Sequence, residues 1–280
     1  MLPTEVAPNV GGRLRPHGVP DPGSQPLRNV DVNSDALAVS RPRYTGSTMS
    51  KPTSAPLRAK RAGSRLSPER IIEASLAIAA RGSADAFTIR RLGEELGTDP
   101  TAIYRHFRDK DELLLSVADR MLGEVLASIP EGLGWQDRLR ALADGSLAAA
   151  IKYPVVASTM ASRTTRRVNE FRIVELILGA VTEAGLEGAD AALYYRVVGD
   201  SLLAFVGQRA SYLLFDADVR ASDESAWTVE YRHVDTAAFP QIGRLGAELA
   251  SVTQDAIFRA RVEGLITAIE RQANGNHASE

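Results

Sequence analysis

Residues 97–114 read GTDPTAIYRHFRDKDELL, and this stretch decides the fold. Asp99 followed by Pro100 is a strong helix start, because aspartate accepts a hydrogen bond from the first turn and proline has no N–H to leave unpaired there. The helix that begins here is expected to end by about Phe107, after barely two turns. Its consecutive Tyr, Arg and His side chains at 104–106 indicate a helix that presents hydrogen-bonding groups, since a helix that only fills a core would not need them.

The segments on either side of this stretch carry three more helix starts. Each is a serine, threonine or aspartate whose side chain can accept a hydrogen bond from the first turn of a helix. These caps are Ser67, Thr88 and Asp109. The first helix is predicted to end at Gly82 and the second at Gly97, with a very short connection to the third. This spacing is typical of a helix-turn-helix inside a compact three-helix unit, which we place at residues 66–113.

Helical spacing predicts which side of the short helix faces the core. Ile103 and Phe107 lie four residues apart, so both are expected to point inward. The first turn then remains outside, where the small side chains of Thr101 and Ala102, next to Pro100, let the backbone approach base edges in the major groove of B-DNA. The arrangement predicts a DNA-reading element.

Hydrogen-bond donors around this helix are placed to hold the DNA backbone. They belong to the short helix itself and to the first turns of the helices before and after it, where backbone N–H groups and the helix dipole also favour an anion. The competing interpretation is a set of ordinary surface residues, because residues 66–112 hold nine acids against seven Lys or Arg. The candidates are Thr88, Arg90, Tyr104, Arg105, His106 and Lys110.

The run FTIRRLGEELGTDPTAIYRHFRDKDELL at 87–114 resembles the DNA-binding domain of the TetR (tetracycline-repressor-like) family of bacterial regulators. The similarity extends roughly from Ser67 to Leu115, and its most specific part is Tyr-x-His-Phe followed by x-x-Lys-Asp. Thr98 stands where the family usually has an apolar turn residue, and Asp99 where serine is commoner. The resemblance implies that phosphates are held by Thr88, Tyr104 and Lys110, that base edges are faced by Arg90, Pro100, Thr101 and Ala102, and that the groove edge is lined by Arg105 and His106.

Residues 114–271 are predicted to form a helical effector-binding and dimerisation domain, so the whole fold is expected to be all-α. Proline and glycine residues mark the breaks between helices, and residues 216–240 lack a clear periodicity and are predicted to be a loop. The predicted helices cover 109–128, 135–153, 166–184, 189–214 and 243–271.

A second copy of the chain is the expected protein partner, because one reading helix contacts only a few base pairs and a two-fold dimer doubles the site. The helices at 189–214 and 243–271 carry wide apolar bands that could form a four-helix bundle with their copies. The alternative is that both helices fill the core of a monomer. The bands contain Ala192, Tyr195, Val198, Leu202, Phe205 and Val206 in the first helix, and Phe258, Val262, Leu265 and Ile269 in the second, which also has a small-residue edge of Ala260, Gly264 and Ala268.

An unidentified small-molecule effector is expected to bind inside this domain and to change the separation of the two reading helices. Asp200 is unusual because it stands in an apolar helix, where an unpaired buried charge is costly. It is expected either to pair with Arg196 one turn earlier or to meet a polar group of the ligand. The candidate effector-binding residues are Tyr153, Arg163, Phe171, Tyr195, Asp200 and Gln208.

The two ends of the chain are predicted to be disordered. Residues 1–65 form an N-terminal extension, because nine of the fourteen prolines lie in 1–57 and too little apolar surface is available to offset the entropy of ordering. Its last part, 51–65, is a basic arm, either a solvated linker or a segment that lies on an anionic polymer. Met49 begins a second stretch that resembles a protein start, so the initiator is Met1 or Met49. Residues 272–280 are expected to be a tail.

Composition excludes several other classes of protein. The chain has 280 residues and a net charge of -2. It has no cysteine, and this excludes disulfides and thiolate chemistry. It has no uninterrupted run of about 18 apolar residues, so a cytoplasmic protein without a membrane span is expected. It also has no G-x-S-x-G, P-loop, G-x-G-x-x-G or His-x-x-x-His motif, so we expect neither catalysis nor a cofactor or metal. The predicted function is a repressor that binds a palindromic operator in double-stranded DNA and is released by its effector; the alternative is a helical protein-interaction scaffold.

Overall fold

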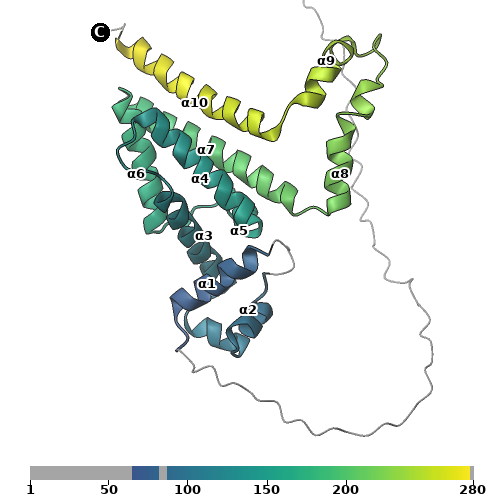
Figure 1. The fold of residues 1–280 in the computed structure, drawn as a ribbon. Coiled ribbons are helices and arrows are strands. Elements are labelled where there is room, and N and C mark those ends of the chain that lie inside the picture. Colours follow the sequence, from purple (N-terminus) through teal and green to yellow (C-terminus); the bar gives the residue numbers. More distant parts are fainter. Residues whose placement is uncertain (1–64, 82–86, 278–280) are drawn as a thin grey trace, which may run out of the picture. The chain divides into compact units, whose positions relative to one another are not determined.

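The computed structural model describes residues 65–81 and 87–277 (Figure 1), and in this part of the chain every regular element is a helix. The predicted N-terminal extension, nearly all of the basic arm, the helix stop at Gly82, the Met49 start and the end of the tail lie outside the described residues. The N-terminal elements are α1 (Pro68–Ala79), α2 (Ile89–Leu96) and the 3₁₀ helix η2 (Pro100–Arg105). The others are α3 (Lys110–Ala127), α4 (Trp135–Lys152), α5 (Pro154–Met160), α6 (Val168–Glu183), α7 (Gly188–Leu213), α8 (Ala217–Ala226), the 3₁₀ helix η3 (Glu230–Arg232), α9 (Pro240–Ser251) and α10 (Gln254–His277).

The four predicted helix caps are confirmed. Ser67 Oγ accepts a hydrogen bond from the Arg70 backbone N–H at 3.4 Å, and Thr88 Oγ1 accepts one from the Arg91 N–H at 3.2 Å. The carboxylates at 99 and 109 do the same for the Thr101 and Glu112 N–H groups, both at 2.8 Å. Each helix start in this region is therefore fixed by a side chain next to it in the sequence.

The third element is shorter and tighter than predicted. Residues 100–105 form a 3₁₀ helix, in which three residues make a turn, and the Phe107 N–H donates to the Ile103 carbonyl at 3.2 Å with α-helical spacing just after it. Ile103 is fully buried and Phe107 is 5% exposed, so the predicted inward face is confirmed. Leu92 of α2 and Leu76 of α1 are buried in the same core.

The turn between α2 and η2 depends on two glycines. Gly97 has φ +64°, a conformation that glycine adopts without steric cost, and this residue ends α2 where the sequence predicts. A Cβ atom on Gly93 would lie 2.9 Å from Pro100 Cγ and 3.1 Å from the Thr98 carbonyl oxygen. The missing side chain at 93 lets η2 pack directly on α2, which is the close approach that a helix-turn-helix requires.

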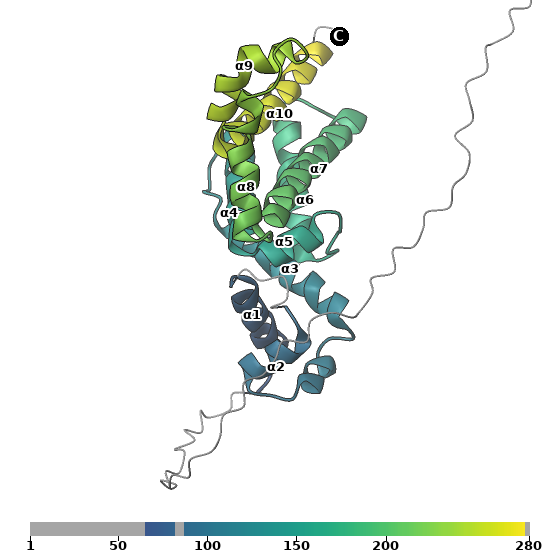
Figure 2. The ribbon, with the colours of Figure 1, turned by 90° about the vertical axis from the view of Figure 1, so that its right-hand side faces the viewer.

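Helix α7 lies at the centre of the C-terminal helices, where it contacts α4, α5, α6 and α10 (Figure 1). Their shared core contains fully buried aliphatic side chains such as Leu142, Val156, Val181 and Val198. A Cβ on Gly207 would lie 2.2 Å from the Cβ of Ala161, so α7 passes very close to the end of α5. Helix α3 connects this core to the helix-turn-helix, because it contacts α1 as well as α4, α5 and α6 (Figure 2).

Three predictions for the C-terminal region are wrong. The expected loop at 216–240 contains α8 and η3. The expected single helix over 243–271 is two helices, because Val252 is extended and the Thr253 hydroxyl accepts a hydrogen bond from the Ala256 N–H at 3.1 Å, which caps α10. Residues 272–277, expected to be part of a tail, belong to α10. None of the described helices is long and apolar enough to cross a bilayer.

The apolar bands proposed for dimerisation lie largely inside one chain. Val198, Leu202, Phe205 and Val206 of α7 are buried, and so are Phe258, Val262 and Ile269 of α10. The rings of Phe205 and Phe258 stack with their centroids 5.0 Å apart. The core alternative is therefore correct for these side chains, whereas Tyr195 and Leu265 are half-buried and Ala192 is exposed.

Candidate DNA-binding surface and ligand cavity

The predicted DNA-contacting residues lie on the outside of α2, η2 and the start of α3. Tyr104 is 47% exposed, although it is a large aromatic side chain beside a buried core. Pro100 and Ala102 are half-buried, as expected for small residues at the base of the reading element. The remaining six are exposed: Thr88, Arg90, Thr101, Arg105, His106 and Lys110.

Acidic side chains near this surface are occupied by neighbours. Glu94 is paired with Arg90, with Nε and Oε1 3.1 Å apart, and Glu95 accepts two hydrogen bonds from Arg81 at 2.9 and 3.0 Å. Hydrogen bonds from Arg81 hold the pKa of Glu95 below its ordinary value. Paired in this way, the two glutamates repel a phosphate chain much less than free carboxylates would.

Asp99 shapes the tip of η2. It accepts hydrogen bonds from both the hydroxyl and the N–H of Thr101, at 2.6 and 2.8 Å, and these bonds hold the pKa of Asp99 below its ordinary value. At the other side of the surface, Lys110 is the first residue of α3, and its Nζ lies 5.9 Å from the centroid of the Phe87 ring. The short helix η2 thus begins at the Asp99 cap, and the cation Lys110 follows its end at the start of α3.

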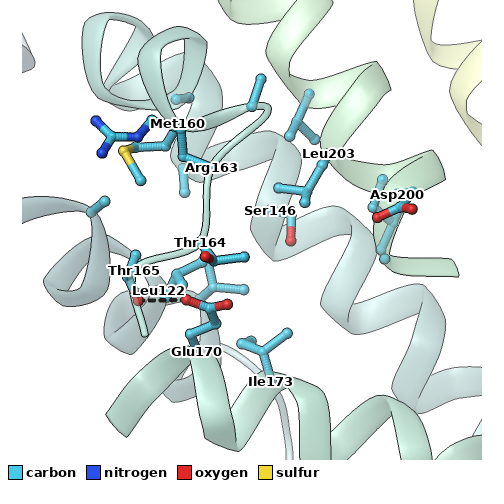
Figure 3. Close-up of a pocket in the computed structure, with 18 of the residues that line it drawn as sticks. Leu122, Ser146, Met160, Arg163, Thr164, Thr165, Glu170, Ile173, Asp200 and Leu203 are labelled. Atoms are coloured by element: carbon cyan, nitrogen blue, oxygen red, sulfur yellow. Dashed lines mark hydrogen bonds between the residues drawn. The ribbon is translucent and has the colours of Figure 1, made fainter. Parts of the chain in front are cut away.

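A cavity of about 410 Å³ lies between α3, α4, α5, α6 and α7 (Figure 3). Its walls are mainly apolar, with Met121, Leu142, Met160, Ile173 and Leu203 among the lining residues. This volume is in the range of pockets that take small organic molecules.

The structure brings three of the six predicted effector-binding residues to this cavity and leaves three away from it. Arg163, Tyr195 and Asp200 line the cavity. The remaining three are not among the lining residues: Tyr153 is buried and donates its hydroxyl to Glu124 at 3.0 Å, whereas Phe171 and Gln208 are exposed. Sequence patterning placed Phe171, Tyr195, Asp200 and Gln208 on helices that border the cavity, but it could not tell which side of each helix faces the hollow.

Of the two alternatives for Asp200, the structure shows the pairing with Arg196, and the side chain is not buried. Arg196 Nη2 lies 2.9 Å from Asp200 Oδ2, and the two side chains are 62% and 59% exposed. The pair lies at the solvent-exposed rim of the cavity and carries no large desolvation cost. Arg196 and Asp200 therefore form an ordinary surface ion pair of the i,i+4 type.

Several polar lining residues were missed by the sequence analysis, namely Ser146, Thr164, Thr165 and Glu170. Glu170 and Ile173 extend from α6 toward Ser146 of α4 and Leu203 of α7 (Figure 3). No local signal marks these residues, because they come together only when the helices pack.

Residues 161–167, which we call the strap, connect α5 to α6 and lie between the cavity and the beginning of α3. Arg163 donates two hydrogen bonds to Asp111 in the first turn of α3, one of them between Nη2 and Oδ2 at 2.8 Å. These bonds hold the pKa of Asp111 below its ordinary value. Arg167 Nη2 also lies 3.4 Å from the carbonyl oxygen of Glu112. A cavity wall and the helix start that carries Lys110 are therefore linked by side chains.

The structure thus combines an N-terminal helix-turn-helix, with an exposed reading element, and a helical C-terminal domain that encloses a cavity. A family model described as bacterial regulatory proteins of the tetR family matches residues 71–117. A second, described as the tetracyclin repressor-like C-terminal domain, matches residues 130–273. Together the two matches cover more than half of the chain, which therefore belongs to the tetR family of bacterial regulatory proteins.

Individual relatives agree with this assignment. The chain is 31% identical over 148 residues to the HTH-type transcriptional repressor Rv1353c of Mycobacterium tuberculosis, a match that covers 50% of this chain and 56% of that one. The chain thus spans about half the length of the curated relatives it matches. Among solved structures, apo ActR from Streptomyces coelicolor shares the fold with a TM-score of 0.66 and 23% identity, covering 77% of this chain and all of ActR. The regulator SCO7222 of the same organism has a TM-score of 0.61 and 26% identity, covering 74% and 99%.

Proposed function

We propose that this protein is a cytoplasmic transcriptional repressor that binds a palindromic operator as a homodimer and releases it when a small molecule enters the cavity. The observation that carries the proposal is the exposure of the reading element: none of Thr101, Ala102 and Tyr104 is sealed inside the protein, although Ile103 between them is fully buried. A non-catalytic role agrees with the family. A repressor among the relatives at 31% identity supports repression by occlusion of a promoter.

In this proposal the short helix η2 enters the major groove. Arg90, Pro100, Thr101 and Ala102 face base edges. Phosphates on the groove walls are held by Thr88, Tyr104 and Lys110, with Arg105 and His106 at the groove edge. Arg90 exchanges its surface partner Glu94 for DNA, which costs little because exposed ion pairs are weak.

DNA binding is tested by gel shift and fluorescence anisotropy with fragments from upstream of the protein's own gene and with duplexes selected from a random pool. We expect salt-sensitive binding to a palindrome by the wild-type protein. The double variant Tyr104→Ala/Lys110→Ala should lose it, whereas Arg172→Ala, which removes an exposed cation on α6, should bind as the wild type does. A folded wild-type protein that selects no sequence would refute the proposal and favour the scaffold alternative.

The proposed dimer uses the outer sides of α7 and α10, since their inner sides are buried in the chain. The exposed edge of α10 contains Ala260 and Gly264, and a Cβ on Gly264 would meet no atom within 4 Å. Ser201 and Ala204 form a similar edge on α7. Small residues let helices approach closely, so the two edges suit a four-helix bundle with the partner.

Sedimentation of Gly264→Arg tests this interface. We expect the variant to be monomeric and to bind the selected palindrome much more weakly than the wild type does. Gly134→Arg, just before α4, provides a control with the same change in charge away from the proposed interface. A dimeric Gly264→Arg protein with full operator affinity would place the interface elsewhere.

A further inference from the structure

Four charged side chains line the cavity, and one of them differs from the others. Arg196 and Asp200 are paired with each other at the rim, and Arg163 is paired with Asp111 of α3. The fourth, Glu170, has no ion-pair partner among the described residues. Among the described residues, Glu170 is therefore the only charged residue lining the cavity that has no oppositely charged partner.

Glu170 uses only half of its hydrogen-bonding capacity. Its Oε2 accepts from the Thr165 hydroxyl at 2.8 Å and from the Arg166 N–H at 2.7 Å. No described group donates to Oε1, which is turned away from Thr165 toward the space bordered by Ser146 and Ile173 (Figure 3). A half-buried carboxylate oxygen in a largely apolar hollow gains most from a donor supplied by a ligand.

We propose that Glu170 is the anchoring residue for a ligand with an apolar body and one strong hydrogen-bond donor, either an ammonium or a hydroxyl group, and that the ligand acts on the strap through this carboxylate. The inference rests on the proposed function, since it names the chemistry of the molecule that releases DNA. The apolar walls accept the body by removing it from water, and the carboxylate repels a ligand that carries another carboxylate.

The connection to the strap follows from the atoms that Glu170 holds. Arg166 has φ +55°, a backbone conformation that costs a non-glycine residue free energy and persists only where the surroundings hold it. The hydrogen bond from its N–H to Glu170 is one of those restraints. A ligand donor that pulls the carboxylate toward the cavity weakens this bond, so the strap can relax.

A conformational change of the strap is transmitted to the DNA-binding unit through the hydrogen bonds of Arg163 and Arg167. Their partners Asp111 and Glu112 lie in the first turn of α3, directly after Lys110. A shift of the strap therefore changes how the start of α3 is held. Because a ligand shifts an equilibrium only by its differential affinity, the donor must bind more tightly when the strap has relaxed.

Three probes that share one ring system test the ligand chemistry: 1-naphthylmethylamine, 1-naphthol and 1-naphthylacetate. Calorimetry with the full-length protein should show the amine or the naphthol binding at least about tenfold more tightly than the acetate. Glu170→Gln keeps an acceptor oxygen for the strap and removes the charge, and it should reduce the preferred probe's affinity by about tenfold. Glu175→Gln makes the same change at an exposed glutamate of α6 that does not line the cavity, and it should leave all three affinities within about threefold of wild type.

The pattern of losses distinguishes the two donors. A loss confined to the amine identifies an ammonium ligand, and an equal loss for naphthol identifies a hydroxyl donor. If Glu170→Gln binds the three probes as the wild type does, or if none of them binds the wild-type cavity, the proposal is wrong. Thermal unfolding of each variant shows whether it is folded.

The effect on the strap is measured with the duplex selected by the wild-type protein. The preferred probe should weaken operator binding by the wild type. Asp111→Asn weakens the link to Arg163 without changing a residue that lines the cavity, so it should bind the probe normally but show at least about fivefold less weakening. Equal weakening in both proteins would overturn the role of the strap while leaving the operator result intact. A wild-type protein that selects no duplex would refute the proposed function instead, and the probe affinities would still report on Glu170.

Discussion

Asp119 of α3 caps the N-terminus of α6 through Asn169. Asp119 Oδ1 accepts a hydrogen bond from the Asn169 backbone N–H at 3.0 Å and from the Glu170 N–H at 3.1 Å, and Oδ2 accepts from Asn169 Nδ2 at 3.0 Å. The Asp119 residue is only 7% exposed. The cap of α6 is thus supplied by a residue fifty positions earlier, so that α3 and α6 are fixed to each other at the edge of the cavity.

Removing this tertiary cap should destabilise the protein strongly. We expect Asp119→Ala to lower the free energy of unfolding by about 3 kcal/mol, because two backbone N–H groups and an amide lose their acceptor in a buried place. Asp119→Asn retains an acceptor oxygen and should cost about 1 kcal/mol. Urea denaturation at one fixed protein concentration measures both values, since dimerisation adds to apparent stability. Equal stability of Asp119→Ala and the wild type would show that the cap is dispensable.

Gly93→Ala should weaken DNA binding without preventing folding. The new Cβ would lie 2.9 Å from Pro100 Cγ and 3.1 Å from the Thr98 carbonyl, so η2 must move away from α2. We expect operator affinity to fall by about tenfold, which corresponds to about 1.4 kcal/mol. Gly134→Ala is the matched control, because a Cβ there meets nothing within 4 Å and its φ is -64°. An unchanged affinity for Gly93→Ala would show that the position of η2 is not critical.

The sequence-based predictions were accurate where the interacting residues lie close together in the sequence, and they failed where the residues lie far apart. The caps at 67, 88, 99 and 109 were predictable because each donor lies two or three residues from its acceptor. The break between α9 and α10 was missed, since Thr253 is a weaker local signal inside a long periodic run. Glu170 could not be found at all, because its surroundings are assembled from α4, α6, α7 and the strap. The inward sides of α7 and α10 were mistaken for a dimer surface for a related reason: an apolar stripe does not show which partner covers it.

Stability should depend on pH through Asp109, the cap of α3. Hydrogen bonds from the Glu112 N–H and from Arg108 hold the pKa of the Asp109 carboxyl below its ordinary value of 3.8. A carboxyl with a lowered pKa in the folded state contributes stability above its unfolded pKa, and this contribution is lost as the pH falls through the folded pKa. Asp109→Asn can still cap the helix but cannot ionise. The wild type should therefore be more stable than Asp109→Asn at pH 6, and the difference should shrink as the pH falls below about 4 and disappear only below the folded pKa of Asp109. Urea denaturation at several pH values tests this, and a difference that stays constant down to pH 3 would contradict it.

Lys110 should hold a phosphate and contribute little to sequence choice. Its ammonium group is exposed at the start of α3, where backbone N–H groups also attract an anion. We expect Lys110→Ala to weaken binding to all duplexes by a similar factor and to reduce the slope of log K against log salt by about 1 per subunit, because one fewer counterion is released. Thr101→Val, in contrast, removes the hydroxyl that donates to Asp99 in the structure and that we propose faces base edges in the complex. It should relax the preference at one base position and leave the salt slope unchanged, since it removes no charge. Anisotropy titrations at four salt concentrations, with the selected palindrome and a single-base variant of it, separate the two effects. A change in base preference for Lys110→Ala, with the slope intact, would mean that the lysine reads bases and that the proposed orientation of η2 in the groove is wrong.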